Sequence, residues 1–263
     1  RCRAFSDFRQ MFGQVEAVSL AVPTSAHYGL GHKLLNAGIH TLIEKPLALT
    51  LSQADGLIRA ARRKRRLLQV GHIERFNAAI QAATQHLTHP RFIEVDRLSP
   101  YPFRGTDVSV VLDVMIHDLD MLLAVVRSRV ARVDALGISV LSQSEDIANA
   151  RVQFASGCVA QLTASRVSPE PIRRIRVFQE DNYLSIDYQA QTVDLAHRTR
   201  KGIRRVALPV NRRPPLEKEL EAFVKSIRQK RPAAVTGKDG REALAFALRI
   251  ERAMHRHGHR YES

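Results

Sequence analysis

The fold is decided by the stretch from Val15 to Leu47, which reads VEAVSLAVPTSAHYGLGHKLLNAGIHTLIEKPL. Its apolar run at 15–22 predicts a strand, the pattern from Ser25 to Asn36 predicts a helix, and the run from Thr41 to Ile43 predicts a second strand. Both strand-like runs are continuously apolar rather than alternating, which is typical of parallel strands that are covered on both faces. We therefore expect a strand, a helix and a strand of a parallel α/β sheet.

The alternation of strand and helix continues to about residue 71. The pattern predicts a helix at 51–65 and a short strand at 67–70. Regular alternation of this kind is typical of a doubly wound parallel sheet. We expect residues 1–72 to be part of such a domain.

The remaining residues, 73–263, predict a second domain with a different pattern of helices and strands. Helical periodicity returns at 75–86 and at 109–126, and two helices close the chain at 216–229 and 241–255. Strands are expected at 92–98, 131–141, 147–154, 158–166, 172–178, 183–187, 191–197 and 203–208. Because adjacent short strands joined by tight turns form antiparallel sheets, we expect an α+β domain with a large, mostly antiparallel open sheet.

Composition restricts the class of protein. With 263 residues, of which 44% are hydrophobic, the chain can bury substantial cores. No stretch approaches the roughly 18 consecutive apolar residues of a membrane span, and the opening Arg1-Cys2-Arg3-Ala4 does not lead into the apolar core that a signal peptide would have. Cys2 and Cys158 lack metal-ligand spacing, so we expect two reduced thiols, no metal site, no membrane partner and a cytoplasmic location.

The net charge of +15 raises the question of nucleic-acid binding, because clustered cations release counterions from phosphate backbones. The arginines instead come in separated groups with few aromatic residues between them to stack on bases. We expect a solvated, arginine-rich surface and no nucleic-acid partner. An anionic small substrate would also suit this charge.

Three ionisable residues mark the helix expected at 109–126. Asp113, His117 and Asp120 lie at i, i+4 and i+7, whereas most other positions are Val, Leu, Ile or Met. Isolated charges are costly in an apolar core, so the stripe should face a wet cavity, a ligand or dedicated partners. His117 could accept a proton from a substrate hydroxyl while Asp113 orients its ring. The alternative is a buried Asp–His pair that joins two elements.

Polar residues also follow the two first strands. Glu44, Lys45 and Pro46 end the second one, where Lys45 could offer a cation to a hydroxyl or carbonyl oxygen, because ligands bind at the carboxyl ends of strands in open α/β sheets. The residues from Pro23 to His27 follow the first strand and open a helix, which Thr24 or Ser25 could cap. A solvated loop and a simple helix cap are the alternatives.

Taken together, four motifs resemble those of the glucose-fructose oxidoreductase, inositol dehydrogenase and rhizopine-catabolism (Gfo/Idh/MocA) family, in the same order and over nearly the whole chain. They are strand-Pro-x-x-x-His (Pro23, His27), Glu-Lys-Pro (Glu44, Lys45, Pro46), Arg-Phe-Asn (Arg75, Phe76, Asn77) and Asp-x-x-x-His-x-x-Asp (Asp113, His117, Asp120). Each motif is weak alone, but four in order are specific.

The resemblance implies an oxidoreductase that transfers a hydride between NAD or NADP and a hydroxyl-bearing carbon of a sugar or nucleotide-sugar. Residues 1–72 would be the C-terminal part of a Rossmann NAD(P)-binding domain, and residues 73–263 would bind substrate and form a homo-oligomer through the large sheet. The catalytic residues would be Lys45, His117 as general acid/base, and Asp113. The cofactor would be bound by Pro23, Thr24, His27, Glu44, Lys45, Pro46 and Arg75. The substrate would be bound by Lys45, Asn77, Asp113 and His117.

Within the family, the stretch at 107–123, DVSVVLDVMIHDLDMLL, is most similar to the subgroup of UDP-N-acetylglucosamine 3-dehydrogenases, which supply 3-keto sugar nucleotides for lipid A. Most other relatives carry a glycine two residues after the aspartate, where this chain has Val114-Met115. The resemblance therefore implies an anionic nucleotide-sugar as substrate.

The G-x-G-x-x-G turn that opens dinucleotide-binding domains does not occur here. We therefore expect the first βα units, about 60 residues, to be missing from the sequence, and with them the selector between NAD and NADP. The alternative function is a catalytically inactive family member or fragment that acts as a binding or scaffold protein. Histidines at 255, 257 and 259 alternate, so on a helix they would diverge rather than bind a metal.

Overall fold

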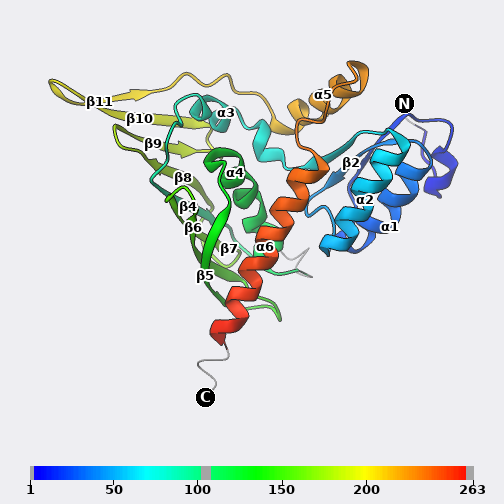
Figure 1. Ribbon diagram of the computed structural model, residues 1–263, viewed down its shortest axis with the longest axis horizontal. Helices are drawn as coiled ribbons and strands as arrows, with labels where there is room; N and C mark the ends of the chain where they lie inside the picture. The colour runs from blue at the N-terminus through cyan, green and yellow to red at the C-terminus, as the bar shows by residue number, and fades with distance from the viewer. Residues whose placement is uncertain (1–2, 102–107, 259–263) are drawn as a thin grey trace. The chain divides into compact units, whose positions relative to one another are not determined.

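The computed structural model describes residues 3–101 and 108–258 and divides the chain into two compact units (Figure 1). Unit 1 contains residues 1–72 and 220–241, and unit 2 contains residues 73–219 and 242–263. From the sequence we expect residues 220–241 in the second domain, whereas in the structure they are part of unit 1. No helix within the described ranges is both long and apolar enough to cross a membrane.

Unit 1 is built on three parallel strands in the order β1-β2-β3. Its elements are a 3-10 helix η1 (Phe8–Met11), β1 (Ala17–Leu20), α1 (Thr24–Asn36), β2 (His40–Glu44), α2 (Leu51–Lys64) and β3 (Leu68–Gly71). Strand β2 is buried in its centre and β3 throughout, as expected of parallel strands covered on both faces, whereas in β1 only Leu20 is buried. The parallel α/β organisation of this part is thus confirmed.

Helices α1 and α2 pack against each other in unit 1, and their N-termini differ. The side chain of Thr50 caps α2 by accepting a hydrogen bond from the Gln53 amide at 3.2 Å. In α1 the N-cap position is Pro23, and no side chain caps the helix. The expected cap by Thr24 or Ser25 is therefore wrong, because both are already residues of the helix and Pro23 occupies the N-cap position.

Residues 220–241 extend unit 1 along β3. The Val70 amide donates to the Val235 carbonyl at 3.1 Å, and Gln69 forms a β-bridge with Thr236. Thr236 and Asp239 then form a reciprocal cap, in which each backbone amide donates to the other residue's side chain, at 2.7 and 3.2 Å. This cap explains why the last helix begins at Gly237, four residues before the expected start.

Unit 2 contains an eight-stranded sheet in the order β11-β10-β9-β8-β4-β7-β6-β5. The strands are β4 (Phe92–Leu98), β5 (Val130–Ile138), β6 (Ile147–Phe154), β7 (Val159–Ser165), β8 (Ile172–Phe178), β9 (Asn182–Asp187), β10 (Thr192–Thr199) and β11 (Gly202–Ala207). Every neighbouring pair is antiparallel except β4 and β7, which are parallel. The mostly antiparallel open sheet is thus confirmed, with one parallel pair at its centre.

The helices of unit 2 cover one face of this sheet. Besides a 3-10 helix η2 (Ile73–Phe76), they are α3 (Ala78–Thr84), α4 (Ile116–Val126) and the parts of α5 (Pro215–Arg228) and α6 (Gly237–Gly258) that belong to the unit. Apolar residues of α3 and α4, such as Ile80 and Leu122, share a small apolar space with Ile93 and Val95 of β4. Phe246 of α6 packs edge to face on Phe154 of β6.

Two expected helices of unit 2 are divided in the structure. The helix predicted at 75–86 is the 3-10 helix η2 followed by α3, which begins after Asn77. The helix predicted at 109–126 is a π-helical turn η3 (Val111–Met115) followed by α4. Apolar periodicity does not distinguish a wide π-turn from an α-turn, because both leave one face apolar.

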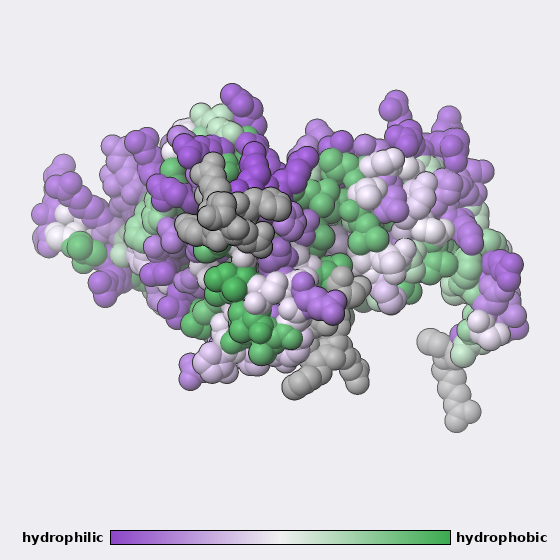
Figure 2. Space-filling model, turned by 90° about the horizontal axis from the view of Figure 1, so that it is seen from below, coloured by the Kyte–Doolittle hydropathy of each residue, from purple (hydrophilic) through white to green (hydrophobic). Residues whose placement is uncertain are grey.

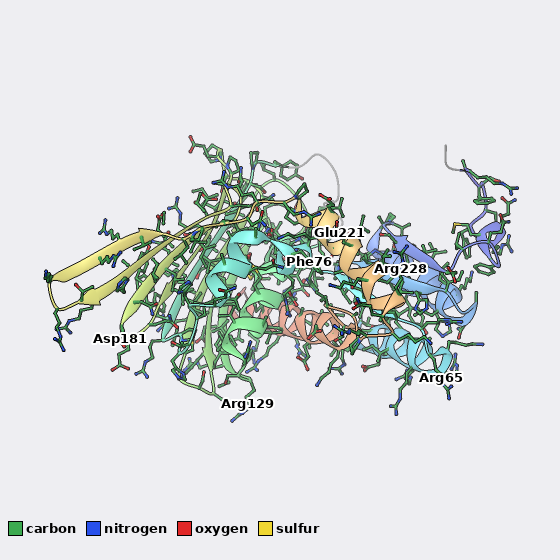
Figure 3. All side chains as sticks on the ribbon, turned by 90° about the horizontal axis from the view of Figure 1, so that it is seen from above. Arg65, Phe76, Arg129, Asp181, Glu221 and Arg228 are labelled. Carbon is green, nitrogen blue, oxygen red and sulfur yellow. The ribbon has the colours of Figure 1, made fainter. Side chains whose placement is uncertain are left out.

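The positive charge is dispersed over both units. Exposed arginines such as Arg65, Arg129 and Arg228 extend away from the elements that carry them (Figure 3). The side of the protein seen in Figure 2 is mainly hydrophilic, with smaller apolar areas between the charged residues. This distribution agrees with a solvated, arginine-rich surface.

A fully buried ion pair holds the loop after β5. The Asp146 carboxylate accepts hydrogen bonds from the amides of Val140, Leu141 and Ser142, and Arg166 Nε donates to it at 2.8 Å. Both charged side chains are completely buried. Burial alone would raise the pKa of Asp146, but the hydrogen bonds from Ser142, Leu141 and Arg166 hold it well below its usual range.

We predict that Arg166→Met lowers the free energy of unfolding by about 3–5 kcal/mol, because Asp146 is left as a buried charge without its cation. Urea denaturation measures the change. The matched control is Arg176→Met, which removes half-exposed ion pairs with Glu94 and Asp96 and should cost at most about 1 kcal/mol. Equal losses of unfolding free energy in both variants would contradict the assignment.

The lowered pKa of Asp146 contributes stability above about pH 4 that is lost as the pH falls.

Candidate functional site

Lys45 lies at the carboxyl edge of the unit 1 sheet, directly after β2. Glu44 and Lys45 are half-buried, whereas Pro46 and Leu47 are buried, and the Lys45–Pro46 peptide bond is cis. The Lys45 amide donates to the Glu44 carboxylate at 3.3 Å. Since parallel strands direct their carboxyl ends to one edge, the turn stands where α/β sheets bind ligands.

His27 lies under the same turn. It is on the first turn of α1 and is 1% exposed. Its Nδ1 lies 2.8 Å from the Pro46 carbonyl oxygen and its Nε2 lies 2.9 Å from the Val22 carbonyl oxygen. Of the other residues predicted at the start of α1, Pro23 is exposed and Thr24 is half-buried. Four of the five residues of the two motifs therefore lie at one edge of unit 1, where His27 contacts Pro46 and Lys45 contacts Glu44.

The edge of unit 1 fits the polar part of a dinucleotide. No side chain caps the first turn of α1, and the amide groups of an uncapped helix N-terminus bind anions. At the end of β3, Gly71 lets the Glu44 carboxylate lie against its Cα, since a Cβ there would lie 2.7 Å from Glu44 Oε2. The uncapped helix start is the feature of this edge that favours a cofactor.

Asp113 and His117 lie on the π-turn and on the first turn of α4 in unit 2. Both side chains are half-buried, between neighbours such as Leu112 and Ile116 that are buried. The turn begins at Ser109, whose hydroxyl accepts from the Leu112 amide at 3.3 Å and is hydrogen-bonded to the Glu251 carboxyl group. Burial raises the pKa of Glu251. Wide π-turns of this kind are frequent at functional sites.

Asp120, the third residue of the predicted stripe, has a dedicated partner. It is 1% exposed and accepts two hydrogen bonds from Arg75, at 2.6 Å from Nε and 2.9 Å from Nη2. The stripe is therefore divided. Asp113 and His117 remain half-buried, whereas Asp120 ties α4 to η2 through Arg75.

Asn77 caps α3 in the structure. Its Oδ1 accepts from the Ala79 amide at 3.0 Å, and its Nδ2 donates to the Tyr188 carbonyl at 2.7 Å. The residue is 2% exposed. The substrate-binding role implied for Asn77, like the cofactor-binding role implied for Arg75, stays a prediction.

A buried ionic cluster beside His117 was not predicted. Arg97 of β4 donates to both carboxylate oxygens of Asp118 at 2.8 and 3.0 Å and to Glu74 at 3.2 Å. The Tyr188 ring covers the guanidinium group at 4.9 Å, and its hydroxyl donates to Asp118 at 3.2 Å. Burial raises the pKa of Asp118, and burial together with Asp118 raises that of Tyr188. This cluster holds the first turn of α4.

A signal for this cluster was present in the sequence. In β4 the inward positions are Ile93, Val95 and Arg97, so the alternation of the strand places an arginine in the core. A buried arginine requires a carboxylate partner. The partner itself could not be chosen among the acidic residues without the fold.

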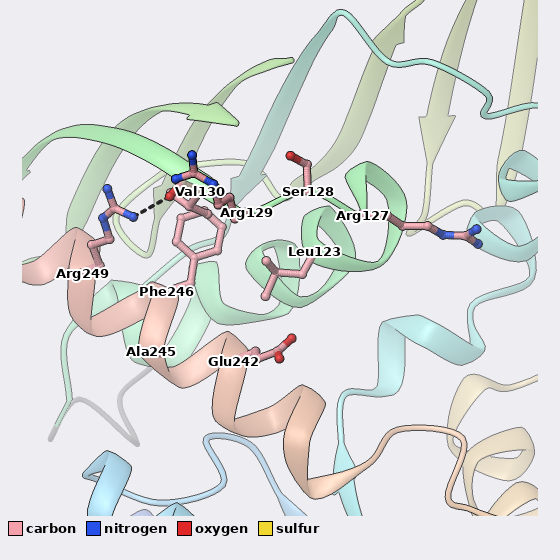
Figure 4. Close-up of a pocket in the computed structure, with 9 residues that line it drawn as sticks. All are labelled: Leu123, Arg127, Ser128, Arg129, Val130, Glu242, Ala245, Phe246 and Arg249. Carbon is pink, nitrogen blue, oxygen red and sulfur yellow. Dashed lines mark hydrogen bonds between the residues drawn. The ribbon is translucent and has the colours of Figure 1, made fainter. Parts of the chain in front are cut away.

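The cavity shown in Figure 4 lies elsewhere in unit 2 and has a volume of about 450 Å³. It is lined by Leu123, Arg127, Ser128, Arg129, Val130, Glu242, Ala245, Phe246 and Arg249. None of these is a predicted site residue, and Arg249 is held by the Val130 carbonyl at 2.8 Å. Within residues 3–101 and 108–258, no three His, Cys, Asp or Glu side chains are grouped as metal ligands. His259 and the side chain of His257 lie outside the described residues.

Two family models match the chain. A model described as an oxidoreductase family with an NAD-binding Rossmann fold matches residues 1–72, and a model of the GFO/IDH/MocA C-terminal domain matches residues 69–185. The UDP-N-acetylglucosamine 3-dehydrogenase of Acidithiobacillus ferrooxidans is 38% identical over 261 residues, which are 97% of this chain and 83% of that protein. Its solved structure has a TM-score of 0.91 over 96% of this chain and 82% of that chain.

More distant relatives have other substrates. The myo-inositol 2-dehydrogenase of Thermotoga maritima is 28% identical over 91% of this chain and 78% of that protein. A structure of levoglucosan dehydrogenase with NADH and levoglucosan has a TM-score of 0.85 at 17% identity, over 96% of this chain and 82% of that chain. At this identity the likeness concerns the fold alone.

We predict that Cys158 is inert in the folded protein. The residue is 2% exposed, and burial raises the pKa of its thiol to about 11, so the reactive thiolate is scarce at neutral pH. In a Cys2→Ser variant, iodoacetamide should label Cys158 only after denaturation, as measured by mass spectrometry. Rapid labelling of the native protein would contradict this assignment.

Proposed function

The chain belongs to the GFO/IDH/MocA family of NAD-binding oxidoreductases, and from this premise we propose that it oxidises the 3-hydroxyl group of UDP-N-acetylglucosamine. The observation that supports this substrate is the similarity to the Acidithiobacillus enzyme along nearly the whole chain. The sequence at 107–123 supports the same subgroup, and a surplus of cations suits an anionic nucleotide-sugar. We place the reaction in the cytoplasm, in keeping with the free thiol of Cys158.

The proposed mechanism assigns one task to each motif residue. A nicotinamide cofactor bound at the edge of unit 1 would supply the acceptor for the hydride of the carbinol carbon. Lys45 donates a hydrogen bond to the reacting hydroxyl oxygen and stabilises the negative charge that develops there. His117 accepts the hydroxyl proton, and Asp113 orients its imidazole ring. The start of α1 and Glu44 would hold NAD or NADP at the edge of unit 1.

The burial of these residues supports their tasks. Lys45 and His117 are both half-buried, so their side chains are partly shielded from water while one side stays accessible. Polar interactions are stronger in such surroundings than in bulk water. The π-turn and the Arg97–Asp118 pair hold the backbone on either side of His117, and a fixed position of the proton acceptor favours catalysis.

We predict that the protein reduces NAD or NADP in the presence of UDP-N-acetylglucosamine, as followed by nicotinamide absorbance. His117→Ala should lower kcat by about 10²–10⁴-fold because the proton acceptor is lost, and Lys45→Ala should have a comparable effect. Lys64→Ala, an exposed lysine on α2, is the control and should leave kcat unchanged.

Free sugars and inositols are tested in the same assay. Faster turnover of one of these than of the nucleotide-sugar would overturn the proposed substrate but not the reaction type. Bound cofactor without turnover of any candidate would instead favour a non-catalytic member of the family.

We also propose that the protein forms a homo-oligomer through the sheet face that the helices of unit 2 leave open. The strand registers place Phe92, Phe178 and Tyr183 in one row across this face, with ring centroids 5.7 and 4.9 Å apart. Ile138 lies opposite Ile147 on the same face and is 51% exposed. A second copy would cover these apolar side chains by a twofold, self-complementary contact.

We predict that Ile138→Asp lowers the molar mass in solution to that of a monomer, because it places a charge in the proposed contact. Size-exclusion chromatography with light scattering measures the mass, and circular dichroism checks the fold. Leu216→Asp on α5 is a matched control, since Leu216 is also 51% exposed. A monomeric wild-type protein, or an unchanged mass in Ile138→Asp, would count against this surface.

A further inference from the structure

The imidazole ring of His27 joins the ends of two neighbouring strands. Val22 follows β1 and Pro46 follows β2, and the ring nitrogens lie 2.9 and 2.8 Å from the carbonyl oxygens of these two residues. Because a carbonyl oxygen only accepts, each contact requires an N–H group on the ring. The neutral ring donates to one of the two carbonyls, and the doubly protonated ring donates to both.

The turn that carries Lys45 is supported from the other side by β3. Glu44 pairs in register with Gly71, and its carboxylate stands over the Gly71 Cα, where a Cβ would lie 2.7 Å from Oε2 and 3.1 Å from the Glu44 Cα. The same carboxylate oxygen accepts from the Lys45 amide. The backbone of Lys45 is thus held between the His27 ring on the β1 side and the Glu44–Gly71 contact on the β3 side.

We propose that His27 is a positioning residue for Lys45 rather than a ligand of the cofactor. This inference rests on the function proposed above, in which Lys45 contacts the reacting hydroxyl group. Both ring nitrogens already face carbonyl oxygens, and only 1% of the residue is exposed, so the ring has no polar atom to offer to a cofactor. Its contact with Pro46 acts on the residue that directly follows Lys45.

The effect of such a residue follows from geometry. A displacement of about 1 Å at a reacting group can lower a rate by about 10²-fold, even when substrate and cofactor still bind. Loss of the contact with Pro46 would free the turn on one side while Glu44 and Gly71 still hold the other. His27 is therefore expected to act on kcat through Lys45 and not on cofactor affinity.

The experiment compares His27→Ala and His27→Gln with the wild-type protein. We expect His27→Ala to lower kcat by about 10²-fold and to leave the Kd of NADH, measured by fluorescence titration, unchanged. The amide N–H groups of His27→Gln can donate to one of the carbonyls, so this variant should recover part of the loss. In a Lys45→Ala background, His27→Ala should cause no further loss, because both changes remove the same interaction.

A second measurement does not depend on turnover. The rate at which an acylating reagent modifies Lys45, followed by mass spectrometry, should change in His27→Gln, whereas the rate at Lys64 should stay the same. Circular dichroism establishes that each variant is folded, and if His27→Ala does not fold, His27→Gln carries the comparison. An altered NADH affinity, an additive loss with Lys45→Ala, or an unchanged acylation rate at Lys45 would overturn the proposal.

The two proposals fail in different ways. If Lys45→Ala retains full turnover, the mechanism assigned to Lys45 is wrong, whatever His27 does. If Lys45→Ala is inactive but His27→Ala weakens NADH binding and leaves kcat intact, the mechanism stands and His27 is a cofactor ligand after all.

Discussion

Parallel pairing of β1, β2 and β3 is the constraint on which the rest of unit 1 depends. The chain leaves every parallel strand at the same edge of the sheet. The residues at these strand ends therefore lie near one another although they are far apart in the sequence. Val22 and Lys45 follow β1 and β2 in this way, and Gly71 is the last residue of β3. The tight packing of this edge then allows one buried ring, that of His27, to connect two strand ends by hydrogen bonds to the backbone.

In unit 2, charged residues are buried in the core between the sheet and the helices. Arg97 is 5% exposed and is surrounded by Asp118, Glu74 and the ring of Tyr188. Burial alone would lower the pKa of Arg97, but its acidic partners outweigh burial and raise it, so it stays charged. Together with the pair of Arg75 and Asp120, this cluster ties Glu74 and Arg75 of η2 to Asp118 and Asp120 of α4. The helix that carries His117 is therefore held at its first turn, as the proton-accepting role proposed for His117 would require.

The fold by itself would not identify the reaction, because relatives with this fold act on inositols, levoglucosan and nucleotide-sugars. What favours hydride transfer is the chemistry of a few positions. A lysine at a strand end, a histidine on a helix that is otherwise apolar and an uncapped helix start are each ordinary features. Their combination within one family narrows the chemistry to a hydroxyl group that loses a hydride and a proton.

The sequence alone determined the order of the elements, the parallel arrangement of the first sheet and the mostly antiparallel arrangement of the second. It could do so because apolar periodicity depends only on residues that are close together in the sequence. Motif spacing likewise singled out Lys45, Asp113 and His117 as candidate catalytic residues, a role that stays a prediction. Only the tertiary structure decided that Asp120 is held by Arg75, that Asp118 pairs with Arg97 and that both nitrogens of His27 face the backbone. These contacts join residues that lie 5 to 45 positions apart, and the choice among many possible partners depends on how the chain packs.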